Sequence, residues 1–514
     1  MSTDQSATPK PADATTFPQL IRAAAAVYGN NTAITLKADT IPDDSATFRE
    51  LDERSALIAK GLIARGVGKG HRVGFIQGNG PQFAAVLAGI ARIGAIAIPI
   101  STLIKANELV RVLRQSDVGG LIVQRSLLGH DYAERLCDAL PGLREGTSPD
   151  LRLPEVPFLR WVVSSGDGLP SGILDQSWLA NAASDVSDEM LLAVEAEVHP
   201  TDQMIEIYTS GSMALPKGVR HCHGPAMFRA DYIARMAETP RGKEGYAFMP
   251  MFWVGGLMMS LLPNWSAGGV TTCTEGTATN NRMAMGSVLP KEEMKVYAIA
   301  KPLWGLGMTE TMGPYTYGDE VRAEGYPLCA PMDHIAERYE VRLADENNVP
   351  VPVGERGEMQ VRGYPVTVGL HKMERDLFFT PDGYYRTGDM CIQQGSRILF
   401  VGRGGDMIKT ASSNVSPAEV EMEMQSLPGV HLAYVVGLPD KERGQIVVAG
   451  VIPREGETLD FAAIEAEMRS RLSSYKVPRL YVEMSHDDVP MLHSNKVSRR
   501  MIEKLLAERL GRAA

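Results

Sequence analysis

Helix-like and strand-like segments alternate along this chain, and the alternation restricts its fold more than any other feature. Residues 50–64 carry apolar residues at helical spacing, and residues 72–76 form a short apolar strand. A second helical segment follows at 82–93, and a second apolar strand at 95–99. Strands that alternate with helices in this way predict an α/β fold, in which helices cover the sheets.

The pattern changes in the second half of the chain. Residues 341–362 contain short strand-like runs joined by Asn-Asn and Gly-Glu-Arg-Gly turns, which predicts a small β region. The adjacent glycines of GRGGD, residues 402–406, give a backbone that can rotate at low cost, so a domain joint is expected there. Helices and strands then alternate again at residues 417–425, 432–438, 445–452 and 461–472.

These segments predict a large N-terminal domain of helix-covered sheets with a small β region, over residues 17–402, and a small mobile α+β domain over residues 403–514. Residues 1–16 are rich in Ser, Thr, Ala and Pro and are predicted to be a disordered tail. The GVGKG run at 66–70 follows a helix and precedes a strand, the reverse of a dinucleotide-binding fingerprint, so it predicts a helix-end turn.

Composition excludes several classes of protein. A formal charge of −10 argues against a broad nucleic-acid-binding surface. No apolar run reaches the length needed to span a bilayer. The five cysteines are scattered and lack CxxC spacing, which indicates reduced thiols and a cytoplasmic location. The sequence leaves the oligomeric state open.

A hydroxyl-rich loop is the first candidate for chemistry. Residues 207–218 read IYTSGSMALPKG, and within them Thr209, Ser210, Gly211 and Ser212 precede Lys217. Backbone N–H groups, hydroxyls and one lysine charge can together surround an anion. The loop fails the P-loop pattern because Lys217 follows proline and precedes glycine. Taken alone, it is as consistent with an ordinary turn before a hairpin as with a phosphate site.

Four further blocks follow in a fixed order: GLGMTE at 305–310, YYRTGD at 384–389, ILFVGRGGDMIK with SNVSPAEVE at 398–421, and PMLHSNKVSRR at 490–500. Together with the loop they resemble the acyl-adenylate-forming superfamily, and most closely its AMP-forming acid–CoA ligases. The resemblance extends over residues 17–510. It implies an enzyme that forms an acyl-adenylate from a hydrophobic carboxylic acid and ATP, and then transfers the acyl group to coenzyme A.

The resemblance also implies roles for individual residues. The hydroxyl-rich loop and Lys217 would bind the β- and γ-phosphates of ATP. Thr309 would lie near the α-phosphate, and Glu310 would be a ligand for Mg²⁺, which prefers oxygen donors. Asp389 would accept hydrogen bonds from the ribose, assisted by Arg403.

The small domain would supply the remaining group. Lys496 would bridge the acid and the α-phosphate, and Gly405 would be the pivot about which this domain rotates between the two half-reactions. Without the co-occurring blocks, an ordinary surface lysine, helix start or turn would be the favoured interpretation of each of these residues.

One interval departs from the family pattern. Only 35 residues, 270–304, separate Gly269 from GLGMTE, where family members carry a much longer stretch with a glycine-rich loop under the adenine. Leu306 replaces an aromatic residue that would stack on adenine, and Trp253 replaces a histidine. These changes predict an incomplete acyl and adenine pocket and impaired turnover.

Three alternatives remain open at this point. A degenerate, non-catalytic family member could bind a nucleotide or a partner. A P-loop NTPase is disfavoured by the failed motif. A metal site at His221-Cys222-His223 is disfavoured because neighbouring residues of a strand point to opposite faces. Asp487-Asp488 is interpreted as a loop before a proline, and the methionines of residues 249–259 as core or an adaptable acyl pocket.

Overall fold

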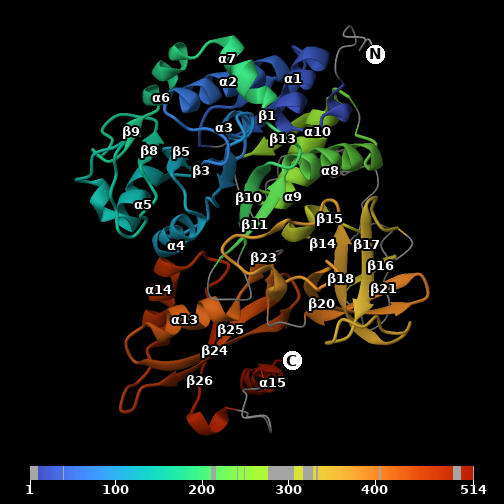
Figure 1. Ribbon diagram of the computed structural model, residues 1–514. Coiled ribbons are helices and arrows are strands. Elements are labelled where there is room, and N and C mark those ends of the chain that lie inside the picture. The colour runs from blue at the N-terminus through green and yellow to red at the C-terminus, as the bar shows by residue number, and fades with distance from the viewer. Residues whose placement is uncertain are drawn as a thin grey trace. The chain divides into compact units, whose positions relative to one another are not determined.

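The apolar strand predicted at residues 72–76 lies in the middle of an eight-stranded sheet (Figure 1). The computed structural model describes residues 10–38, 40–209, 216–239, 241–247, 249–275, 306–316, 328–331, 334–403, 407–411, 413–489 and 499–512. Contacts divide the chain into two units. Unit 1 comprises Met1–Thr102, Ser116–Tyr208 and Gly218–Gly402, and unit 2 comprises Leu103–Gln115, Thr209–Lys217 and Arg403–Ala514.

The eight strands of this sheet have the order β19-β11-β10-β4-β3-β5-β8-β9. Six of them run parallel to one another: β3 (Arg72–Ile76), β4 (Ile96–Pro99), β5 (Gly120–Val123), β8 (Trp161–Ser164), β9 (Leu174–Asp175) and β10 (Gln203–Thr209). The other two, β11 (Lys217–Cys222) and β19 (Gly369–Leu370), pair antiparallel with each other. The carboxyl ends of the six parallel strands therefore lie at one edge of the sheet.

Helices surround these strands in sequence, as the alternation predicts. The segments expected at 50–64 and 82–93 are confirmed as α2 (Phe48–Ala64) and α3 (Pro81–Ala91). A capping box starts α2, because the Thr47 hydroxyl accepts from the Glu50 N–H at 3.1 Å and the Glu50 carboxylate accepts from the Thr47 N–H at 2.8 Å. Every residue of α3 except Gln82 is buried. The helix α2 is followed by Gly66 at φ 77°, so the GVGKG run is a helix-end turn.

The remaining helices of this part of the chain are short to medium in length. The α-helices are α1 (Phe17–Tyr28), α4 (Ala106–Ser116), α5 (Tyr132–Ala139), α6 (Ser177–Ala182), α7 (Asp188–Ala196), α8 (His223–Met236), α9 (Val254–Gly256) and α10 (Leu262–Ala267). The 3₁₀ turns are η1 (Pro11–Asp13), η2 (Pro141–Leu143) and η3 (Ala183–Asp185), and η4 (Leu257–Leu261) is a π-helical turn. Within the segment predicted as a disordered tail, residues 1–16, Pro11 and Thr16 are buried and η1 forms. Residues 1–9 lie outside the described residues, so the tail stays a prediction.

A second sheet of unit 1 has four strands in the order β12-β13-β1-β2. They are β1 (Thr32–Lys37), β2 (Asp44–Thr47), β12 (Glu244–Tyr246) and β13 (Val270–Thr274). The strand β13 pairs parallel with β1 and β12 and begins the interval that is short in this chain. Residues 276–305 lie outside the described part, so the expected incompleteness of this pocket stays a prediction.

The small β region predicted at 341–362 belongs to a five-stranded sheet in the order β16-β21-β20-β18-β17. The strands are β16 (Leu328–Pro331), β17 (Tyr339–Ala344), β18 (Arg356–Gly363), β20 (Tyr385–Gln394) and β21 (Arg397–Arg403), and η6 (Arg375–Leu377) precedes β20. Leu306 packs into the apolar core of this region beside Tyr315 and Tyr339. Its side chain is therefore a core residue, which explains why an aliphatic residue is tolerated there.

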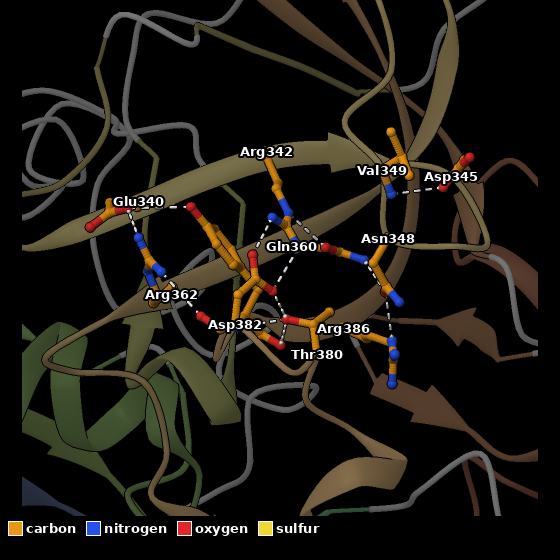
Figure 2. Close-up of polar contacts among 11 residues, drawn as sticks. Glu340, Arg342, Asp345, Asn348, Val349, Gln360, Arg362, Thr380, Asp382 and Arg386 are labelled. Carbon is orange, nitrogen blue, oxygen red and sulfur yellow. Dashed lines mark hydrogen bonds and ion pairs between the residues drawn. The ribbon is translucent and has the colours of Figure 1, made fainter.

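Charged and polar side chains cover part of this sheet (Figure 2). The Arg342 guanidinium donates to Asp382 Oδ2 at 2.6 Å and to Gln360 Oε1 at 2.9 Å. The Tyr384 ring has guanidinium carbons 4.0 Å away at Arg342 and 4.5 Å away at Arg362, which are cation–π distances. The hydrogen bonds from Arg342 and Thr380 lower the pKa of Asp382 to about 2.

Unit 2 contains a sheet in the order β23-β22-β25-β24, with β26 parallel to β25. Its strands are β22 (Ile408–Thr410), β23 (Ser413–Val415), β24 (Val430–Asp440), β25 (Gly444–Pro453) and β26 (Leu480–Glu483), and its helices are α13 (Pro417–Gln425), α14 (Phe461–Arg471) and α15 (Arg499–Arg509). The four elements predicted between residues 417 and 472 are confirmed in type and position. Asp488 caps a 3₁₀ turn, η7 (His486–Asp488), through Ser485.

A buried lysine links three segments of unit 2. The Lys476 ammonium lies 2.5 Å from Glu108 Oε1 and 2.8 Å from Glu419 Oε1. Burial acts to lower the pKa of Lys476, but Tyr475 and the two carboxylates outweigh it and raise that pKa. The lysine therefore remains charged and holds α4 and α13 to the segment before β26. No helix in the described ranges is long and apolar enough to cross a membrane.

Candidate active site

A tight turn of unit 1 carries the predicted α-phosphate and magnesium residues. The two-stranded ladder of β14 (Gly307–Met308) and β15 (Gly313–Pro314) encloses η5 (Thr309–Thr311). Glu310 is buried, and its Oε1 accepts a hydrogen bond of 2.9 Å from the Tyr385 hydroxyl. Its backbone carbonyl accepts from the Thr367 N–H at 2.7 Å. Tyr385 therefore fixes the side chain of Glu310, and Thr367 fixes its backbone.

The turn is also held from the strand that follows the hydroxyl-rich loop. His221 in β11 is buried, and its Nε2 lies 2.8 Å from the Thr309 carbonyl oxygen. Burial lowers the pKa of His221 to about 4. The ring is then neutral near pH 7 and donates from Nε2, because a carbonyl oxygen can only accept. His221 thus orients the Thr309 backbone.

Asp389 lies in an irregular part of β20. The pairs Glu358–Met390 and Gln360–Arg386 leave three residues of β20, Thr387 to Asp389, opposite the single residue 359 of β18. Gly388 supplies the left-handed conformation in this bulge with φ 74°, and its N–H donates to Glu358 Oε1 at 2.8 Å. Tyr385, Thr387 and Asp389 are all buried, in alternation along the strand. The bulge therefore places Asp389 on the same face of β20 as Tyr385, the donor to Glu310.

A charged network supports the two strands that flank residues 209–217. Glu206 of β10 is fully buried, and its carboxylate bonds the Arg72 guanidinium, the Tyr208 hydroxyl at 2.6 Å and the Gln203 amide at 3.1 Å. Burial and the Glu206 charge raise the pKa of Tyr208, so the phenol keeps its proton. A Cβ at Gly218 would lie only 2.6 Å from Glu206 Oε1. The network therefore requires glycine as the second residue of β11.

Only some of the adenylation residues predicted from the sequence lie in the part of the chain that the structure describes. Thr209 ends β10, and Lys217 begins β11 and is buried. Arg403 ends β21. Ser210, Gly211, Ser212, Gly405 and Lys496 lie outside the described residues, so their roles stay predictions.

Two residues that support this site, Tyr385 and Thr367, were not predicted from the sequence, and a third, His221, has a different role from the one considered. Tyr385 and Asp389 are four residues apart in YYRTGD, a spacing that places both side chains on one face of a strand. Nothing in the local sequence indicated that Tyr385 bonds Glu310. Thr367 carries no motif. His221 was considered only as a metal ligand, whereas its Nε2 contacts a carbonyl and His223 Nδ1 accepts from the Phe17 N–H at 3.1 Å. Among the residues that the structure describes, no group of three His, Cys, Asp or Glu side chains could hold a metal.

Comparison with known proteins identifies the family. The chain matches the model for AMP-binding enzymes over residues 21–306 and the model for the C-terminal domain of AMP-binding enzymes over residues 419–496. It is 27% identical over 494 residues to a feruloyl-CoA synthase from Amycolatopsis sp., covering 88% of this chain and 92% of the relative. It is 26% identical over 512 residues to an indoleacetate–CoA ligase from Aromatoleum aromaticum, covering 91% and 94%.

A solved structure agrees in fold. The o-succinylbenzoate CoA synthetase from Bacillus subtilis, as a double mutant, matches with a TM-score of 0.70 at 18% identity, covering 94% of this chain and 98% of that chain. The predicted fold class is thus confirmed. This chain belongs to the AMP-binding enzyme family. It is an ATP-dependent acid–CoA ligase that forms an acyl-adenylate and uses ATP, Mg²⁺ and coenzyme A.

The described residues fit this chemistry. Glu310 offers carboxylate oxygens, the ligand type that Mg²⁺ prefers, and Mg²⁺ commonly takes one or two carboxylates together with substrate phosphates. A carboxylate has about four lone-pair sites, so the hydrogen bond from Tyr385 leaves capacity for a cation. Asp389 supplies a second buried carboxylate, of the kind that accepts hydrogen bonds from hydroxyls.

Proposed function

We propose that this ligase activates a hydrophobic carboxylic acid, with Thr309, Glu310 and Asp389 in the large domain as its adenylation residues. The observation that carries the proposal is the Tyr385–Glu310 hydrogen bond, because it ties the GMTE turn to the strand that bears Asp389. Feruloyl-CoA synthase and indoleacetate–CoA ligase are named for aryl-containing acids. These names support aromatic acids as the first substrates to test.

The proposed reaction has two steps. A carboxylate oxygen of the acid attacks the α-phosphorus of ATP, and pyrophosphate leaves as the acyl-AMP forms. Glu310 would hold Mg²⁺, and the loop of Thr209, Ser210, Gly211 and Ser212, with Lys217, would bind the departing phosphates. These groups act where negative charge accumulates, which is where electrostatic stabilisation is most effective. The coenzyme A thiol then attacks the acyl carbon, and AMP leaves.

The small domain would serve both steps in different orientations. We assign the large domain to residues 17–402 and the small domain to residues 403–514, with Gly405 as the pivot, and Arg403 beside the ribose or phosphate. Lys496 would contact the acid and the α-phosphate only during adenylation. Four described cysteines, Cys137, Cys222, Cys273 and Cys391, are buried thiols that form no disulfide with one another, which supports our proposal of a cytoplasmic, reducing location.

Pyrophosphate release in the presence of ATP, Mg²⁺ and a panel of aryl and alkyl acids tests the proposal. We expect release that depends on the acid, and a melting temperature raised by ATP with Mg²⁺. A degenerate binding protein would show the thermal shift without release. Release of phosphate in the absence of any acid would contradict the ligase assignment and favour an NTPase.

Single substitutions separate the two carboxylates. Asp389→Ala should weaken ATP binding measured by calorimetry, because ribose contacts are lost. Glu310→Ala should abolish the Mg²⁺ dependence of pyrophosphate release. Glu355→Ala, at an exposed turn beside the same sheet, is the matched control and should change neither quantity. Normal Mg²⁺ dependence in Glu310→Ala would remove that residue from the proposed metal site.

A further inference from the structure

Unit 1 contains a cavity that none of the proposed adenylation residues lines. Its volume is about 690 Å³, within the range of small-molecule sites. The cavity lies at the carboxyl ends of the parallel strands β3, β5 and β8, where it is lined by the residues that follow them, Gln77, Gln124 and Ser165. Ligands of open α/β sheets bind at this edge. Figure 1 shows α2 and α6, which also line the cavity, lying beside each other on this part of the sheet.

Most of the wall is apolar. Three helices and two strands contribute aliphatic side chains to it, namely Ile58 of α2, Val86 of α3, Leu179 of α6, Ile122 of β5 and Val163 of β8. Leu57 also lines the cavity, although half of its surface, 50%, is exposed. An exposed leucine at the mouth of an apolar cavity would be covered if an apolar molecule occupied it. The wall therefore favours a ligand with a hydrocarbon body.

One polar group in this wall has no hydrogen-bond partner among the described residues. Gln77 is only 4% exposed, and its Oε1 makes no hydrogen bond to any residue that the structure describes. A buried acceptor without a partner is destabilising, and the great majority of buried polar groups in proteins are hydrogen-bonded. A ligand that donates one hydrogen bond would satisfy Gln77.

The charged groups around the cavity argue against an acid as that ligand. Asp44, Asp175 and Glu275 line it, whereas Arg54 is the one basic residue of the lining and lies 3.6 Å from Asp44. Glu275 accepts from the backbone N–H groups of Thr40 and Leu128, each at 3.0 Å. A carboxylate placed here would face a surplus of negative charge. The acid substrate of the ligase is therefore not the expected occupant.

We infer that this cavity binds an uncharged amphipathic molecule, an alcohol with a hydrocarbon body whose hydroxyl donates to Gln77 Oε1. The site is separate from the proposed adenylation site and does not depend on it. Decan-1-ol is a suitable probe, and its binding to the full-length chain can be measured by calorimetry. We expect binding to persist when coenzyme A and an alkyl ester of AMP are both saturating.

Matched variants and ligands test the role of Gln77. Gln77→Met keeps the size of the side chain but removes the acceptor, and it should weaken decan-1-ol binding about five- to tenfold, the effect of one hydrogen bond. Gln394→Met makes the same substitution at an exposed residue of β20 that lies outside the cavity lining, and it should leave binding unchanged. Decyl methyl ether lacks the hydroxyl donor, so it should bind the wild type and Gln77→Met equally. Decanoate should bind the wild type more weakly than decan-1-ol does.

A second variant addresses the cavity itself. Ala180 is exposed on α6 at the cavity lining, so Ala180→Trp can block the space without disturbing the core, and it should abolish binding. The unliganded Gln77→Met protein should melt at the wild-type temperature or higher, since an unpaired buried amide is removed. Displacement of decan-1-ol by the AMP ester or coenzyme A would overturn the inference. Binding that neither variant changes, or a marked loss of stability in Gln77→Met, would overturn it as well.

Discussion

At the scale of single residues, His221 links protonation to folding. Burial lowers its pKa in the native chain to about 4, whereas an unfolded histidine titrates near 6.5. As the pH falls below 6.5, the unfolded chain takes up the proton first, so native stability decreases until the pH reaches about 4. From this residue we expect a loss of about 2 kcal/mol between about pH 7.5 and 5.

Urea unfolding of the wild type and of His221→Asn at both pH values measures this contribution. Asparagine can still donate to the Thr309 carbonyl but does not titrate, so the variant should lose less stability on acidification. His334→Asn, at an exposed position, controls for the substitution itself. Equal pH dependence in the wild type and in His221→Asn would show that the pKa of His221 is not lowered in the native state.

Lys496 is the residue on which the proposed first half-reaction depends most. Lys496→Ala should reduce acyl-AMP formation about 10²–10³-fold, because a charge directed at the transition state is lost. Thioester formation from supplied acyl-AMP should be largely spared, since the lysine serves only one orientation of the small domain. Pyrophosphate release and thioester formation are measured separately, with Lys504→Ala in α15 as the surface control. Adenylation at the wild-type rate would refute this role.

At the scale of secondary-structure elements, the pairing of β10 and β11 depends on one glycine. A Cβ at residue 218 would lie 2.6 Å from Glu206 Oε1 and 2.7 Å from the Tyr208 hydroxyl oxygen. Gly218→Ala should therefore displace the buried Glu206–Arg72 network and cost about 1–3 kcal/mol. Because these strands flank the proposed phosphate loop, the KM for ATP should also rise.

The matched control is Gly68→Ala, where a Cβ would meet no atom within 4 Å. Denaturant unfolding reports the stability of both variants, and initial rates at several ATP concentrations report the KM. If Gly218→Ala is as stable as Gly68→Ala, the network can move without cost, and the proposed support of the loop would be wrong.

At the scale of the whole molecule, the short interval that begins with β13 and precedes the GMTE turn sets the expected performance of the enzyme. Only 35 residues, 270–304, precede GLGMTE, where the resemblance to the acyl-adenylate-forming superfamily predicts a longer segment. The residues that directly follow β13, 275–282, are mostly polar and are a poor replacement for a buried strand. We expect self-association, weak selectivity among acids, and turnover well below ordinary enzyme rates of about 1–10³ s⁻¹.

A steady-state pyrophosphate assay over acids of increasing chain length, together with light scattering, measures all three properties. Sharp chain-length selectivity and ordinary turnover from a monodisperse protein would show that the short interval builds a complete pocket. Slow turnover with ordinary selectivity would contradict the prediction as well, because the missing pocket wall should affect both.

Residue patterns alone were enough to predict the fold class, most elements and the candidate adenylation residues. These features are local: apolar periodicity sets strands and helices, and the GMTE and TGD blocks carry their residues within a few positions of each other. The folded chain was needed to show that Tyr385 bonds Glu310 and that His221 holds Thr309. It was also needed to show that Gln77 lines a cavity and that its Oε1 has no partner in the part of the chain that the structure describes. The first two contacts join residues 75 and 88 positions apart, and chain folding rather than local pattern decides which distant groups meet.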